Sequence, residues 1–104
     1  MMKVDEILPK ARVLAEHCAG DGVPDNLLAM VLSHLRRHRD VPATLRLLSA
    51  LPQSPFGQRT RSTFRQMTGL KRHATAAISG ISSWEEAAWI VGWARRLVRS
   101  FGAR

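Results

Sequence analysis

The 104-residue sequence has a single cysteine, no tyrosine and no long apolar run. One cysteine can form neither an intramolecular disulfide nor a cysteine-based metal site within the chain. The apolar stretches are too short for a membrane-spanning helix, which needs roughly 18–20 residues. The first residues carry acids and Pro9 where a secretory signal needs a continuous apolar block. We therefore expect an intracellular, cytoplasmic protein with no membrane partner.

Acidic residues are few and are concentrated near the N-terminus. Residues 1–26 hold five acids and three bases, a net charge of −2, whereas residues 27–104 hold three acids and thirteen bases, a net charge of +10. No acid lies between Val41 and Trp84. A genomic preference for arginine would explain why arginines outnumber lysines, but it would not explain the missing acids. This asymmetry is typical of a protein that binds a polyanion.

The motifs of common active sites are also missing. The glycines lack the spacing of a P-loop or a dinucleotide-binding loop, and no carboxylates are placed as an acid–base pair. His34 and His38 are four residues apart and could share a metal ion, but the glutamate of an HExxH motif and a third ligand are absent. We therefore expect a protein that is not an enzyme and that holds no metal or cofactor.

The composition is that of one globular domain, with 45% hydrophobic and 23% charged residues. A chain of this length has no room for a second core. Apolar residues recur at helical spacing between proline and glycine breaks, and no segment shows the alternation of a strand. The sequence therefore predicts a single all-α domain over residues 1–104, a compact bundle of about five helices.

Glycine and proline set the boundaries of the predicted helices. We expect helices over about 4–19, 24–38, 42–51 and 60–79, and a last one that begins after Ser83. Residues 51–58 form the one long loop, in which Phe56 is expected to pack against the body of the protein. Cys18 lies at helical spacing from apolar neighbours and is predicted to be a buried thiol. Four residues of the fourth helix are predicted to face the core: Phe64, Met67, Ala74 and Ile78.

The last helix has the clearest start and the least clear role. Ser83 and Glu86 have the spacing of a capping box, in which the serine oxygen accepts from the amide three residues on. The apolar residues then go nearly all the way round the helix, which is typical of a central helix or of one that binds a partner. Three tryptophans can hardly all be buried in so small a domain. Trp89 and Trp93 are therefore candidates for a protein interface, with a core position as the open alternative.

Two arginine clusters stand near the ends of predicted helices. One closes the second helix, where the helix dipole alone would favour bases, and consists of Arg36, Arg37 and Arg39. Four consecutive bases (counting His38) exceed what capping needs, so a nucleic-acid contact stays equally open. The other cluster consists of Arg95, Arg99 and Arg104. It would extend the basic surface of the fourth helix if the last two helices pack antiparallel.

The most specific signal is a set of residues at i, i+4, i+7 and i+11 on the fourth helix, here named the arginine stripe: Arg61, Arg65, Thr68 and Arg72. Arg59 precedes the stripe and Lys71 stands beside it. The stripe is about 16 Å long, so its guanidinium groups could meet successive phosphates, each through two hydrogen bonds. A solvated helix face usually mixes both signs of charge, but no acid lies in this helix. The stripe is therefore predicted to contact phosphates.

In overall character the chain resembles the small subunits of CRISPR–Cas effector complexes. The residues that carry the resemblance are the arginine stripe and the segment 84–97, WEEAAWIVGWARRL. The resemblance implies a non-catalytic subunit that stacks head to tail in several copies along the backbone of the effector. Such a subunit would help to hold the guide RNA or the guide–target RNA–DNA duplex. Its acidic N-terminal helix would meet the basic face of the next copy.

Two further functions stay open. An adaptor without a nucleic-acid partner would dock on another protein through its tryptophans and place its arginines against acidic groups. A free-standing DNA-binding regulator would use residues 27–51 as a helix-turn-helix, but residues 42–51 offer few side chains that can read base edges. RNA-recognition motifs need a sheet with exposed aromatics, which this sequence does not predict. Backbone contact, which gives affinity without sequence preference, is the favoured mode.

Overall fold

The computed structural model describes residues 4–55 and 57–102, which form five α-helices, one short 3-10 helix and no strand. The α-helices are α1 (Val4–Gly20), α2 (Asp25–His38), α3 (Val41–Ala50), α4 (Arg61–Ile78) and α5 (Trp84–Gly102), and the 3-10 helix η1 covers Leu51–Gln53. The prediction of a small all-α bundle of about five helices is confirmed. The predicted position of Phe56 lies outside the described residues.

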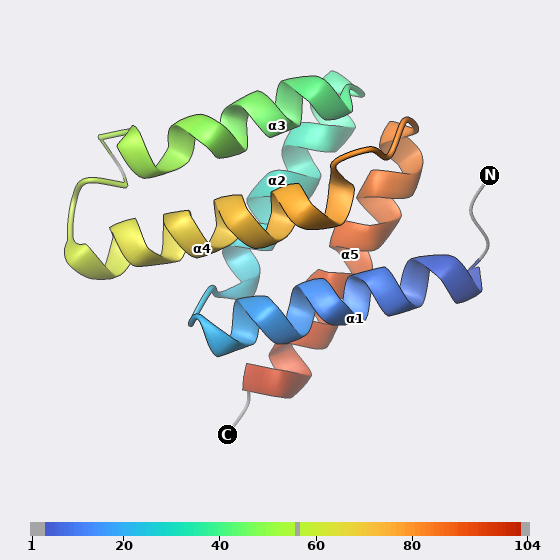
Figure 1. The fold of residues 1–104 in the computed structure, drawn as a ribbon, viewed down its shortest axis with the longest axis horizontal. Helices are drawn as coiled ribbons and strands as arrows, with labels where there is room; N and C mark the ends of the chain where they lie inside the picture. The colour runs from blue at the N-terminus through green and yellow to red at the C-terminus, as the bar shows by residue number, and fades with distance from the viewer. Residues whose placement is uncertain (1–3, 56, 103–104) are drawn as a thin grey trace.

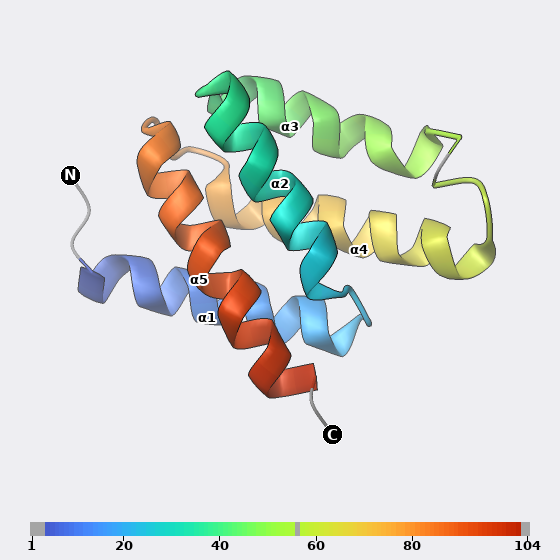
Figure 2. The same ribbon diagram turned by 180° about the vertical axis from the view of Figure 1, so that it is seen from behind.

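The helices are arranged in two layers. Figure 1 shows α1, α4 and α3 side by side in one layer, with α4 in the middle and in contact with both neighbours. Seen from behind in Figure 2, α2 and α5 cross this layer as a second one and run in opposite directions beside each other. The most extensive helix contacts join α5 to α1 and to α2. The outer surfaces of α4 and α5 therefore lie on opposite sides of the domain.

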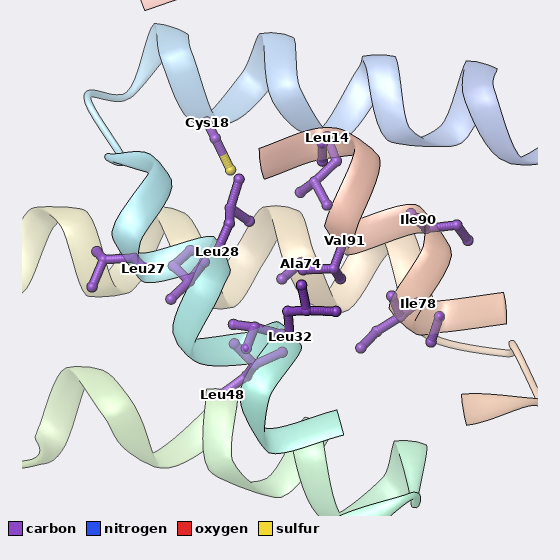
Figure 3. Close-up of a cluster of buried hydrophobic side chains, with 14 of the residues drawn as sticks. Leu14, Cys18, Leu27, Leu28, Leu32, Leu48, Ala74, Ile78, Ile90 and Val91 are labelled. Carbon is purple, nitrogen blue, oxygen red and sulfur yellow. The ribbon is translucent and has the colours of Figure 1, made fainter. Parts of the chain in front are cut away.

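One core fills the space between the two layers. Leu28 and Val31 of α2 are fully buried, as are Ala74 of α4 and Val91 of α5, and Figure 3 shows side chains of the helices converging there. α1 and α5 both bury small residues, Ala11 and Ala15 in α1 and Ala87 and Ala94 in α5. Small buried side chains let helix axes approach closely, which is consistent with the extensive contact between α1 and α5.

Cys18 is fully buried in this core, as the sequence predicts. Burial, with a smaller contribution from the charge of Asp21, raises the pKa of Cys18 to about 12. A thiol with such a pKa stays protonated at neutral pH, and the thiol form is not nucleophilic. The side chain therefore acts as a small apolar core residue.

The predicted helix boundaries are largely confirmed. α1 and α4 are followed by glycines in left-handed conformations, Gly22 with φ 70° and Gly80 with φ 87°. The amide of Glu86 donates to the hydroxyl of Ser83 at 3.4 Å, which provides the serine half of the predicted capping box. Thr60 caps α4 in the same way, since its hydroxyl accepts from the amide of Thr63 at 2.9 Å.

The prediction of a core position is wrong for one residue of α4. Met67, Ala74 and Ile78 are buried, but the side chain of Phe64 is 40% exposed. The first turns of α4 run beside α3 and beyond the reach of α5 (Figure 1), so the second layer does not cover this part of the helix. Helical periodicity predicts which side chains of a helix face the same way. It does not predict how much of the length of the helix a neighbouring helix covers.

Candidate nucleic-acid interface

The arginine stripe lies on the outer face of α4, opposite the residues that α4 contributes to the core. Arg61 and Arg65 are exposed, and among the described residues neither has an ion-pair partner. Arg59 and Lys71 are exposed as well. The hydroxyl of Thr68 donates to the carbonyl of Phe64 at 2.8 Å. The N-terminal half of the stripe therefore presents guanidinium groups that the protein itself does not neutralise.

The expectation of a single-signed stripe is wrong at its C-terminal end. Asp21, in the turn between α1 and α2, accepts from Nη2 of Arg72 at 2.9 Å, and its Oδ2 lies 2.5 Å from Nε2 of His73. Gly69 faces this turn, because a Cβ atom at Gly69 would lie 3.2 Å from Cγ2 of Val23 and 3.4 Å from Cβ of Asp21. A small residue at this point lets the turn approach α4. Sequence reasoning detects the lack of acids within the helix but misses an acid from a distant turn.

The contacts of the Asp21 carboxylate with Arg72 and His73 make the stability of the fold depend on pH in the acidic range. The hydrogen bond with His73, and then the one with Arg72, hold the pKa of Asp21 below its ordinary value. Because the folded-state pKa is the lower one, ionised Asp21 stabilises the fold above the ordinary value of about 4. This stabilisation is lost as the pH falls through the folded-state pKa.

We therefore expect Asp21→Asn to lower the melting temperature at pH 7, and we expect the difference from the wild type to shrink below about pH 4. Thermal unfolding followed by circular dichroism at pH 7, 5 and 3 measures this difference. Glu16→Gln is a control, because Glu16 forms only an exposed pair with Arg12 on α1. A difference for Asp21→Asn that stays constant over this range would contradict the assignment.

A second basic surface is an open groove on the outer side of α5, here named the α2–α5 groove. It has a volume of about 830 Å³, and it is lined chiefly by α5 with Leu32 and Arg36 of α2. Figure 2 shows this side of the molecule, where α2 and α5 run beside each other. At its middle, the side chain missing at Gly92 leaves space above Leu32, since a Cβ atom there would lie 3.8 Å from Cδ2 of Leu32. The remaining lining residues are Trp84, Glu85, Ala88, Trp89, Trp93, Arg95, Arg96 and Arg99.

In the described part of the chain, acids stand only toward the ends of the α2–α5 groove. Oδ2 of Asp25, at the start of α2, lies 4.0 Å from Nε of Arg95 and 3.8 Å from Nε of Arg99. Glu85 lies in the first turn of α5. Between these acids, Arg36 and Arg96 have no ion-pair partner among the described residues. The groove therefore combines two uncompensated cations with an aromatic lining.

The three tryptophans of α5 have different surroundings. Trp84 and Trp93 are half-buried and pack against the core. A guanidinium group lies over each ring, that of Arg39 at 5.6 Å from Trp84 and that of Arg96 at 5.3 Å from Trp93. Trp89 is 52% exposed. Trp89 therefore lies at the surface and Trp93 at the edge of the core, and a protein interface at either residue stays a prediction.

The cluster at the end of α2 belongs partly to this groove. Arg36 lines it, and Arg39 reaches Trp84 from a left-handed backbone conformation with φ 52°. For a residue other than glycine this conformation costs roughly 1–2 kcal/mol. The amide of Arg39 closes the helix by donating to the carbonyl of Leu35 at 2.8 Å. Arg37 is exposed and lines neither the groove nor the stripe.

The stripe and the α2–α5 groove are separate surfaces. Arg95 and Arg99 would extend the stripe only if α4 and α5 packed antiparallel along their length, and this condition is not met. α5 packs instead on α1 and α2, and no residue of α4 lines the groove. Arg104, the third member of that cluster, lies outside the described residues. Sequence reasoning also missed Arg96, although its spacing of three residues from Trp93 is typical of neighbours on one helix face.

The two histidines that could share a metal ion do not gather further ligands. The ring centroids of His34 and His38 are 4.2 Å apart, and Nδ1 of His34 lies 2.8 Å from Oγ1 of Thr44. Partial burial, followed by the charges of His38 and Arg37, lowers the pKa of His34. Within residues 4–55 and 57–102, no group of three or more histidine, cysteine or acidic side chains is placed to hold a metal ion.

Over the same described ranges, every helix is too short or too polar to cross a bilayer.

Comparisons of the chain with protein-family models, with curated proteins and with solved structures found no match.

Proposed function

We propose that this protein is a non-catalytic nucleic-acid-binding subunit that contacts the phosphate backbone of RNA, or of an RNA–DNA duplex, inside a multi-subunit complex. The observation that carries the proposal is the set of exposed bases without an ion-pair partner in the described part of the chain. On the α4 side these are Arg59, Arg61, Arg65 and Lys71, and on the α2–α5 side they are Arg36, Arg37, Arg39 and Arg96. Two further such bases, Lys10 and Arg46, lie outside both basic surfaces.

Uncompensated arginines on a folded surface favour a polyanionic partner for a physical reason. Like charges along one helix face repel one another. A row of phosphates bound beside them would neutralise these charges and attract each arginine in turn. A guanidinium group can also donate two parallel hydrogen bonds to one phosphate. Where the chain pairs an arginine internally, as at Arg72, the partner is a carboxylate that a phosphate would have to replace. Arg61 and Arg65 need no such exchange.

The resemblance to the small subunits of CRISPR–Cas effector complexes stays a prediction. Three of the five acids in residues 1–26 contact bases of the same chain: Glu16, Asp21 and Asp25. Asp5 and Glu6, which are exposed at the start of α1, remain for a charge contact with the next copy. Head-to-tail stacking would therefore use the first turn of α1 instead of its whole length.

The alternative function as a protein adaptor is favoured by one observation, the exposure of the large apolar ring of Trp89. For the free-standing DNA-binding regulator no comparable observation exists. The exposed side chains of α3, which would be its recognition helix, are Pro42, Arg46, Ser49 and Ala50. Only Arg46 and Ser49 among them can donate hydrogen bonds to a base edge.

The proposal is tested by measuring the binding of the purified protein to short single-stranded RNA, single-stranded DNA, duplex DNA and an RNA–DNA duplex. We expect log K to fall linearly with log salt, by about 0.7 per phosphate contact on a single strand and about 0.9 on a duplex. Fluorescence anisotropy at several salt concentrations gives these slopes. The absence of binding to all four nucleic acids at low salt would contradict the proposal and favour the adaptor.

A further inference from the structure

Of the three tryptophan rings of α5, only that of Trp89 has no guanidinium group over it in the described part of the protein. The rings of Trp84 and Trp93 are half-buried, and the guanidinium groups of Arg39 and Arg96 lie over them. Trp89 is more than half exposed, at 52%. An exposed indole ring is a large apolar surface, and it can stack on another flat ring. Trp89 is therefore the one tryptophan whose ring can take an external aromatic group.

The space beside Trp89 is open. Gly92 lies three residues further along α5, on the same face, and has no side chain. Ala88, next to Trp89 in the lining, has a single methyl group. The α2–α5 groove that these residues form with Leu32 has a volume of about 830 Å³, which is within the range of 300–1,000 Å³ typical of ligand sites. A flat ring the size of a nucleobase can lie against Trp89 without displacing a side chain at position 92.

Cations flank this space on both sides. Arg36 approaches from α2, and Arg96 lies one helical turn beyond Gly92. The α5 side of the groove runs from Trp84 to Arg99, about 22 Å along the helix axis. Arg95 and Arg99 are held less firmly than a close salt bridge would hold them, since their Nε atoms lie 4.0 and 3.8 Å from Asp25. A chain of phosphates that follows the groove would meet Arg36 before the Trp89 region and Arg96 after it.

A positively charged groove with an aromatic platform is the arrangement that binds single strands, because every base has a face that can stack. In a duplex the faces of the bases are already stacked on their neighbours, and contact with Trp89 would first require unstacking. We infer that the α2–α5 groove binds a single-stranded segment of nucleic acid, with one base stacked on Trp89 and the adjoining phosphates held by Arg36 and Arg96. This inference rests on the proposed function and adds to it the strandedness of the ligand and the face that binds it.

The test compares a ten-nucleotide oligothymidine with an abasic strand of the same length, using fluorescence anisotropy at fixed salt. We expect the wild type to prefer the strand that carries bases. Trp89→Ala should weaken binding of that strand on the order of 5- to 150-fold and should leave the abasic strand unaffected. Trp89→Phe, which keeps an aromatic ring, should retain most of the affinity. Gly92→Leu changes no charge and leaves the Trp89 ring in place, but its side chain should fill the space beside that ring. It should therefore weaken binding of the base-bearing strand as Trp89→Ala does.

Phe64→Ala is the matched control, because Phe64 is the exposed aromatic residue of α4, beside the arginine stripe and on the opposite side of the domain. It should leave both affinities unchanged. If the base-bearing and abasic strands bind equally, and Trp89→Ala changes neither, the inference is wrong while the proposed function stands. If Phe64→Ala weakens binding of the base-bearing strand and Trp89→Ala does not, the inference is also wrong. The bases would then stack beside the arginine stripe. Absence of binding to either strand contradicts the inference, and it contradicts the proposed function only if RNA and the two duplexes also fail to bind.

Discussion

Changing Arg61 and Arg65 together to glutamate should weaken the binding of a nucleic-acid duplex by at least about 60-fold at 0.1 M salt. Each phosphate contact on a duplex contributes about 0.9 log unit for a tenfold dilution of salt from 1 M, so two lost contacts remove about 1.8 log units. The added carboxylates repel phosphates and increase the loss. The slope of log K against log salt should fall by about 1.8. Anisotropy titrations at several salt concentrations measure both quantities.

Arg72 is best left unchanged in this variant, although it belongs to the arginine stripe. A glutamate at position 72 would stand beside Asp21, whose Oδ2 lies 2.9 Å from Nη2 of Arg72, and like charges at this separation would destabilise the turn between α1 and α2. Loss of binding in a triple variant would then combine loss of contact with loss of structure. Arg61 and Arg65 have no ion-pair partner among the described residues, so their replacement tests contact alone.

The matched control is the pair Lys10→Glu and Arg46→Glu, which changes two exposed bases of α1 and α3 outside both basic surfaces. Each reversal removes one positive charge and adds one negative charge, so both double variants take the formal net charge from +8 to +4. If the stripe makes direct contacts, its variant loses far more affinity and salt dependence than the control. Equal losses would mean that the overall charge attracts nucleic acid and that the stripe has no special role.

The features that the sequence predicts correctly are local ones. The breaks at Gly22 and Gly80, the serine cap of α5 and the inward direction of Met67 depend on residues a few positions apart. Such signals are read within one or two turns of a helix, and they suffice for the number of helices and for most of their bounds. The fold class follows from them because the strand pattern is absent throughout.

The features that the sequence does not predict depend on which helices become neighbours. Asp21 and Arg72 are 51 residues apart, and they meet because Gly69 lets the α1–α2 turn approach α4. Arg36 reaches the groove of α5 because the second layer pairs α2 with α5. No local pattern specifies either pairing. The basic residues, which form one broad class in the sequence, are therefore divided by the fold into two faces and several internal ion pairs.

Replacing Leu28 by alanine should destabilise the domain strongly. Leu28 is fully buried between the layers (Figure 3), and loss of a buried leucine side chain costs about 2–5 kcal/mol. Small domains have a total stability of about 5–15 kcal/mol. In a domain of this size the melting temperature should fall by roughly 10–30 °C. Val13→Ala is the control, since Val13 is 51% exposed and its truncation should cost less than about 0.5 kcal/mol.

The same variant tests whether the two layers unfold together. All three tryptophans lie on α5, so their fluorescence reports the second layer alone, whereas circular dichroism at about 222 nm reports the helices of both layers. Because α1 and α4 share one core with α2 and α5, we expect the two signals to change at the same temperature in the wild type and in Leu28→Ala. A helical signal that survives after the tryptophan fluorescence has changed would mean that α1, α3 and α4 fold without the second layer. In that case the arginine stripe and the α2–α5 groove would belong to units of separate stability, and binding at one face would not require the other face to be folded.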